Sequence, residues 1–126
     1  MLRFLFQLLL TFLDCQTALG MENYGIPNER VQASSEWKFD KAIHGRLHFQ
    51  SRSGNQGAWS AKTKDANQWL QIDLGSVFTK VTGVATQGRY MYDQWVTKYK
   101  VQFSNGGSTF TNYKEPGQAE IGRAHV

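Results

Sequence analysis

Two stretches of the chain interleave large apolar side chains with charged ones, in an order that suits neither a strand nor a helix. Residues 35–41 (loop 1) read SEWKFDK, and residues 87–94 (loop 3) read QGRYMYDQ. Between them, residues 50–57 (loop 2) read QSRSGNQG, a small, flexible and cationic segment. Aromatic and methionine tips beside arginine and lysine indicate binding, because the apolar part can leave water while the cation meets an anion or an acceptor oxygen.

Two classes of ligand fit these loops. At a membrane interface the apolar tips enter the headgroup region and the cations meet anionic lipid, at about 1 kcal/mol per basic residue. A glycan or a matrix protein would instead be held by aromatic faces and arginine hydrogen bonds. An alternative for each aromatic side chain is that it folds back and caps the core. The candidate ligand-binding residues are the same for both classes: Trp37, Lys38, Phe39, Arg52, Arg89, Tyr90, Met91 and Tyr92.

Catalytic and metal-binding patterns are weak. His44 and His48 lie four residues apart, but Gly45 disfavours a helix there and no acidic third ligand is near, so two ordinary surface histidines are the simpler interpretation. The chain has no G-x-S-x-G, P-loop or G-x-G-x-x-G motif. Asp65 and Asp73 are neighbouring carboxylates, and Asp73 is expected to form a structural ion pair with an arginine. We therefore expect a protein that is not an enzyme and uses no cofactor, with calcium left open because loop carbonyls could supply ligands.

Composition limits the remaining classes. The chain has 126 residues, which is one domain at most, and one cysteine, which excludes an internal disulfide framework. A formal net charge of +4 gives a mild preference for anionic partners. No block of consecutive basic residues is present, so we expect no nucleic-acid partner.

Alternating apolar and polar residues predict an all-β domain, built as an antiparallel sandwich or barrel. Four strands are predicted at residues 31–34, 69–75, 80–86 and 95–103, and an Asn-Gly turn separates the last from a further strand at 108–111. Trp59, Trp69 and Trp95 lie in or beside these strands and are predicted to pack in the core. Loops at one end of a sandwich converge, so loops 1 to 3 could form one composite site.

The two ends differ in character from the middle. Arg3 precedes an apolar run at residues 4–13 that is too short to span a bilayer, so residues 1–14 are predicted to be a secretory signal peptide or a non-native leader. The alternative is that this run forms an apolar strand or helix of the fold. Residues 120–126, EIGRAHV, match the in-frame translation of a sequencing adapter, which leaves residues 15–119 as the predicted domain.

Short motifs in a fixed order carry a family resemblance. The chain resembles a discoidin domain, the type C domain of coagulation factors V and VIII, in ALGMEN at 18–23, GIP at 25–27, ASS at 33–35, GRL at 45–47, AW at 58–59, QWLQIDLG at 68–75, TQGR at 86–89 and WVTKY at 95–99. Each motif alone is weakly specific, whereas the ordered set is highly specific.

The resemblance implies an extracellular β-sandwich of jelly-roll (galactose-binding-like) type, secreted or part of an ectodomain. Its hairpin loops, called spikes in this family, bind phospholipid, glycans, collagen or other cell-surface ligands, and they would fall at residues 35–41, 50–57 and 89–94. Cys15 would be the first half of a closing disulfide whose partner is missing, as are the family's closing strands. The expected function is cell adhesion by a non-catalytic module through a glycan or protein. Binding to anionic phospholipid and an accessory role in a larger secreted enzyme are the alternatives.

Overall fold

The computed structural model describes residues 2–4, 17–54, 56–75, 79–114 and 122–123. Its regular elements are short strands and two single-turn 3₁₀ helices, which confirms the all-β prediction at the level of class. In chain order they are β1 (Leu2–Phe4), η1 (Asn28–Arg30), β2 (Val31–Ala33), η2 (Ala42–His44), β3 (Leu70–Ile72), β4 (Lys98–Tyr99), β5 (Gln102–Phe103), β6 (Thr111–Asn112) and β7 (Gly122–Arg123).

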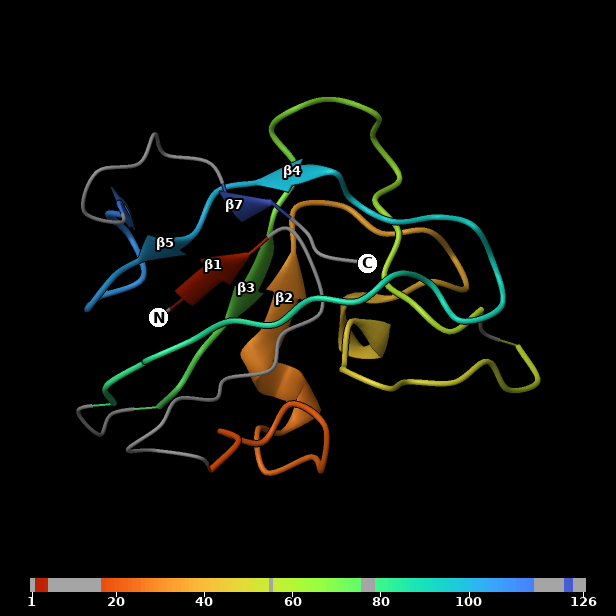
Figure 1. The fold of residues 1–126 in the computed structure, drawn as a ribbon, viewed down its shortest axis with the longest axis horizontal. Coiled ribbons are helices and arrows are strands. Elements are labelled where there is room, and N and C mark those ends of the chain that lie inside the picture. Colours follow the sequence, from red (N-terminus) through yellow and green to blue (C-terminus); the bar gives the residue numbers. More distant parts are fainter. Residues whose placement is uncertain (1, 5–16, 55, 76–78, 115–121, 124–126) are drawn as a thin grey trace.

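Two antiparallel sheets organise these strands. The larger has the order β2-β3-β1-β5-β6, and the smaller pairs β4 with β7. Leu2 lies opposite Ile72 on one side and opposite Phe103 on the other, so β1 joins β3 to β5. Figure 1 shows β1, β3 and β2 side by side, with the long connecting loops extending to the right. The short strands leave most of the chain to loops, whose positions must be fixed by side chains.

The core lies around β3. Leu70 and Ile72 are fully buried, and Gln71, whose side chain projects from the opposite face of β3, is buried as well. The predicted strand at 69–75 is thus confirmed in its centre, but both of its faces are covered. Seven buried residues form one cluster: Met21, Ile26, Val31, Ala42, Trp59, Leu70 and Ile72.

Two strand predictions need correction. Residues 80–86 run beside the core with Val81 and Val84 half-buried, yet they form no strand of the described sheets. The predicted strand at 95–103 is two separate pieces, since β4 pairs with β7 and β5 pairs with β1 and β6. The chain therefore changes sheets between residues 99 and 102, which interrupts the period-two pattern and leaves Phe103 half-exposed.

The chain ends are placed in part. Leu2–Phe4 forms β1, which includes only the first residue, Phe4, of the apolar run at residues 4–13. Removal of residues 1–14 during export stays a prediction, and residues 5–16, Cys15 among them, lie outside the described residues. Of the adapter-like heptapeptide, Gly122–Arg123 forms β7, and its other five residues lie outside the described part.

A buried arginine fixes the segment that precedes β2. Arg46 is 1% exposed, and its guanidinium donates to the carbonyl oxygens of Met21 and Ile26, both at 2.9 Å. It also donates to Asn28 Oδ1 at 2.7 Å, and the ring of Tyr24 lies 4.3 Å from its central carbon. The planar guanidinium group donates to three acceptors at once. Arginine is required here, because a lysine ammonium cannot reach the three acceptors in the same geometry.

We predict that Arg46→Lys lowers the free energy of unfolding by about 2–3 kcal/mol, since it leaves buried carbonyl oxygens without donors. Urea denaturation of the purified chain measures this. Arg52→Lys, the same exchange at an exposed position of loop 2, is the matched control and should change stability by less than about 0.5 kcal/mol. Equal effects of the two variants would contradict the role given to Arg46.

Candidate functional site

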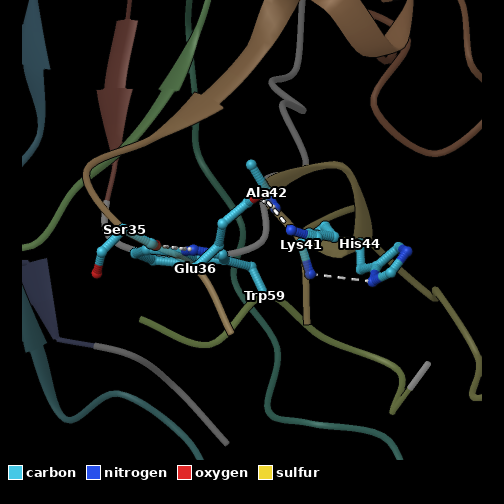
Figure 2. A network of polar contacts seen from close by, with 6 residues as sticks. All are labelled: Ser35, Glu36, Lys41, Ala42, His44 and Trp59. Carbon is cyan, nitrogen blue, oxygen red and sulfur yellow. Dashed lines mark hydrogen bonds and ion pairs between the residues drawn. The ribbon is translucent and has the colours of Figure 1, made fainter. Parts of the chain in front are cut away.

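Loop 1 is held against the segment around Trp59 by backbone hydrogen bonds. The Trp37 N–H donates to the Ser60 oxygen at 3.0 Å, and the Ser60 N–H donates to the Asp40 oxygen at 3.2 Å. The Trp59 indole N–H donates to the Ser35 oxygen at 2.9 Å, which fixes the start of the loop (Figure 2). With its backbone fixed, loop 1 turns the side chains of Trp37 and Phe39 outward, where each is about half-exposed.

A carboxylate closes the far end of loop 1. Glu36 accepts the Lys41 ammonium at 2.9 Å and the Ala42 N–H at 2.8 Å, and His44 Nδ1 accepts the Lys41 N–H at 3.2 Å (Figure 2). Burial alone would raise the pKa of Glu36, but the bond from Ala42 and the contact with Lys41 outweigh it and hold the pKa below its ordinary value of 4.5. Burial also lowers the pKa of His44 from its ordinary 6.5. Near neutral pH the loop therefore holds a charged Glu36 and an uncharged His44.

The two histidines of the sequence pattern have different partners. His44 stacks on Phe49, with 4.9 Å between ring centroids. His48 lies at the surface, and its Nδ1 is 2.7 Å from Glu22 Oε1. Within the described residues no three histidine, cysteine or carboxylate side chains are grouped as a metal site would need. His44 is thus partly buried in the 3₁₀ helix η2, whereas His48 is exposed.

The side chain of Arg89 joins all three loops. Its Nη2 lies 3.6 Å from Asp40 Oδ2 of loop 1, and its Nε donates to the Gln56 oxygen of loop 2 at 3.1 Å. Nη2 also donates to Gln56 Oε1 and Nη1 to Gln94 Oε1. The side chains of Arg89 and Asp40 are only 10% and 9% exposed, so the pair is shielded from water. The predicted convergence of the loops thus has one arginine at its centre, and this arginine is occupied by the chain's own oxygens.

Arg89 also fixes the turn at the tip of loop 3. The Tyr92 ring lies 4.3 Å from the Arg89 guanidinium, and the Arg89 N–H donates to the Gln94 oxygen at 2.9 Å, which closes the turn. At the tip, Met91 has a left-handed backbone with φ of 60° and is 81% exposed. Figure 1 shows loops 1 to 3 gathered on the right-hand side of the molecule.

Loop 2 consists of small and polar residues and contains no aromatic side chain. Arg52 is exposed, and Asn55 lies outside the described residues. Gly57 has a φ of 77°, and a Cβ built there would lie 3.0 Å from the Cβ of Tyr90, so loop 2 and loop 3 touch at this glycine. The contact explains why Tyr90 is only partly exposed, in contrast to its neighbour Tyr92.

Comparison with known proteins decides the family. The profile of the F5/8 type C domain matches residues 29–126. This chain belongs to the F5/8 type C domain family. Lactadherin of Bos taurus is 40% identical over 112 residues, which cover 84% of this chain and 26% of that protein, and lactadherin of Sus scrofa is 38% identical over 112 residues. Coagulation factor V of Sus scrofa is 39% identical over 108 residues, covering 80% of this chain and 5% of that protein.

Family membership confirms the resemblance inferred from the motifs and the predicted extracellular location. The chain spans about a quarter of the length of lactadherin, so it corresponds to one part of such a protein. In the described part of this F5/8 type C domain, no helix is long and apolar enough to cross a bilayer.

Among the predicted structural residues of the F5/8 type C domain, Trp59 is buried and Trp69 partly buried. Trp95 is 48% exposed, so its predicted core position is wrong: it precedes β4 and lies beside loop 3. The Asp73 carboxylate accepts the Gly75 N–H at 2.8 Å and closes the turn after β3, and it forms no ion pair with an arginine of the described residues, contrary to the prediction.

Sequence reasoning missed the polar residues that position the loops. Gln56, Gln87 and Gln94 each orient a neighbour through a side-chain amide, and Asp40 is a buried counter-charge. The available signal was that glutamine both opens and ends loop 3, QGRYMYDQ, around its arginine.

We predict that Arg89→Met lowers the free energy of unfolding by about 3 kcal/mol, because it leaves the buried Asp40 carboxylate without a counter-charge. Adding Asp40→Asn should restore part of that loss, since it removes the unpaired charge. Urea denaturation of both single variants and the double variant measures the coupling. Strictly additive effects would show that the pair does not join the loops.

We predict that the free energy of unfolding falls in two steps as the pH is lowered, because of two groups at the end of loop 1. The lowered pKa of His44 favours its neutral form in the fold, so its contribution is present above about pH 6.5 and is lost as pH falls through the folded value. The lowered pKa of Glu36 adds stability above about pH 4.5, which is lost as pH falls below that value. Unfolding midpoints measured from pH 8 to 3 should show both steps.

Each step has its own variant. His44→Gln should remove the step that begins near pH 6.5, and Glu36→Gln should remove the one below pH 4.5. A pH profile unchanged in both variants would contradict these assignments.

Proposed function

We propose that the chain is an extracellular, non-catalytic binding module whose loops 1 and 3 dock on membranes that carry anionic phospholipid. The observation that carries the proposal is the strained backbone of the exposed Met91. Its φ is positive, and this conformation is disfavoured by about 1–3 kcal/mol for a bulky side chain. Glycine would relieve this strain. A methionine held there and left exposed to water is poorly suited to the isolated fold but well suited to entering an apolar phase.

The surroundings of Met91 support the same ligand. Trp37, Phe39 and Tyr92 are each about half-exposed on loops that Arg89 joins, so several apolar tips can enter one interface together. Fully burying one such side chain contributes about 1.5–3 kcal/mol. Lys38 lies with its ammonium 5.2 Å from the centre of the Phe39 ring, and Arg52 is exposed on loop 2. These cations can meet anionic headgroups at about 1 kcal/mol each, while Arg89 positions the loops.

Cell adhesion through a glycan or a matrix protein remains the second candidate. Aromatic tips and cations of loops 1 and 3 could grip such a ligand, but neither ligand accounts for the strained Met91. The accessory-enzyme hypothesis gains no support from the relatives, whose names are lactadherin and coagulation factor V. We further propose that the whole domain is the jelly-roll sandwich of its family, of which the described sheets form a part.

We predict that Met91→Gly keeps or raises the free energy of unfolding and lowers membrane affinity about 10-fold or more. Glycine relieves the left-handed strain but removes the inserted side chain. Co-sedimentation with vesicles of phosphatidylcholine that contain about 20% phosphatidylserine measures the affinity. Urea denaturation of the same protein measures the stability.

Matched controls separate the loops from general exposure. Tyr92→Ala should weaken vesicle binding, whereas Tyr113→Ala, at an equally exposed tyrosine outside the three loops, should not. Vesicles of phosphatidylcholine alone should bind weakly. Equal binding of the wild type to both vesicle types, or full binding by Met91→Gly, would reject the membrane function.

A further inference from the structure

The methionines of the chain differ sharply in their access to water. Met91, at the tip of loop 3, is 81% exposed, whereas Met21 is 4% exposed and belongs to the core cluster. The remaining methionine, Met1, lies outside the described residues. Dissolved reagents can therefore reach the thioether sulfur of Met91, while the fold shields that of Met21.

Loop 3 holds Met91 at its tip without using the methionine side chain. The Arg89 N–H donates to the Gln94 oxygen at 2.9 Å, and the Gln94 N–H donates to the Tyr92 oxygen at 2.8 Å. The ring of Tyr92 lies against the Arg89 guanidinium at 4.3 Å. These contacts join the neighbours of Met91 to one another, so a chemical change at its sulfur leaves the turn in place.

An exposed thioether reacts with hydroperoxides. The sulfur lone pair of Met91 attacks the terminal peroxide oxygen, and the S–O bond forms as the O–O bond breaks. The proton of the attacked oxygen moves to the departing oxygen, which leaves as an alcohol, or as water when the reagent is hydrogen peroxide. The sulfur gives up two electrons and the peroxide takes them. The product, methionine sulfoxide, is polar, and methionine sulfoxide reductases return it to the thioether.

The added oxygen has different costs in water and in a membrane. At 81% exposure the sulfoxide of Met91 stays hydrated, so the free protein keeps its stability. In an apolar phase the same oxygen would lose its hydrogen bonds to water, which opposes burial of the side chain. Oxidation thus acts against the docked state and leaves the folded state unchanged.

We propose that Met91 is a redox-modification site, at which hydroperoxides weaken membrane docking and methionine sulfoxide reductases restore it. The inference rests on the proposed membrane function, because it supplies the regulation of the same loop. Trp37, Phe39 and Tyr92 keep their exposed rings, so the oxidised protein retains a residual affinity.

Peptide mapping after treatment of the full chain with dilute hydrogen peroxide tests the site itself. Trypsin separates the three methionines, because Met1 falls in peptide 1–3, Met21 in 4–30 and Met91 in 90–98. Peptide 90–98 should gain one oxygen at least about 10-fold faster than peptide 4–30, in line with the exposure of the two sulfurs. Equal rates would overturn the assignment of the site, whether or not the protein binds membranes.

Co-sedimentation with the same anionic vesicles, before and after peroxide, tests the regulation. The wild type should lose affinity about 10-fold or more, and reductases for both sulfoxide epimers should restore it. Met21→Leu, a volume-conserving change in the core, should lose affinity to the same extent as the wild type. Met91→Leu should show the same affinity before and after peroxide. Cys15 is present in all three proteins, so oxidation of its thiol affects them alike.

The two proposals fail in different ways. If the membrane function is wrong, the untreated wild type does not bind anionic vesicles, and the regulation falls with it. If only the regulation is wrong, binding is present before peroxide and persists once peptide 90–98 is fully oxidised. Equal loss of affinity in the wild type and Met91→Leu would assign the effect to another residue, and a lowered urea midpoint after oxidation would assign it to the fold. Either result overturns the inference.

Discussion

The buried guanidinium of Arg46 is the interaction on which the described fold most depends. The strands are only two or three residues long, so backbone ladders fix little of the chain. A single fork that donates to Met21, Ile26 and Asn28 takes over that task for the segment leading into β2. Because each acceptor is buried or partly buried, loss of the guanidinium would leave these oxygens without a hydrogen-bond donor and shielded from water. The core cluster around β3 can then pack against a fixed neighbour.

Arg89 has a similar part among loops 1 to 3, and this bears on the binding proposed above. Loops tied to a common cation move less relative to one another than loops that only touch, so their apolar tips stay in one arrangement before a ligand arrives. Preorganisation of this kind lowers the entropy lost on binding. Arg89 itself is nearly buried, and its guanidinium is occupied by Asp40, Gln56 and Gln94, so its part in the proposed function is to position the loops.

Local sequence patterns foretold the class of fold and the location of the loops, and missed what depends on distant partners. The motif QWLQIDLG predicted β3, and the unusual composition of SEWKFDK and QGRYMYDQ marked the exposed tips, since both signals are contained in a few adjacent residues. The change of sheet between residues 99 and 102 depends on β1 and β7, so period two alone placed Trp95 in the core wrongly. The roles of Asp40 and Gln87 likewise depend on partners about 40 to 50 residues away along the chain. The ligand contacts themselves stay predictions.

The central position of β1 makes the larger sheet depend on pairings between residues that are far apart in the sequence. Leu2 lies opposite Ile72 and opposite Phe103, about 70 and 100 residues further along the chain. Pairings between such distant residues form slowly, because closing the long intervening loops costs conformational entropy. Since β1 lies between β3 and β5, the β5–β6 pair joins the β2–β3 pair only after β1 has found both of its neighbours. Assembly of the larger sheet is therefore a late and cooperative event in the folding of the described part of the chain.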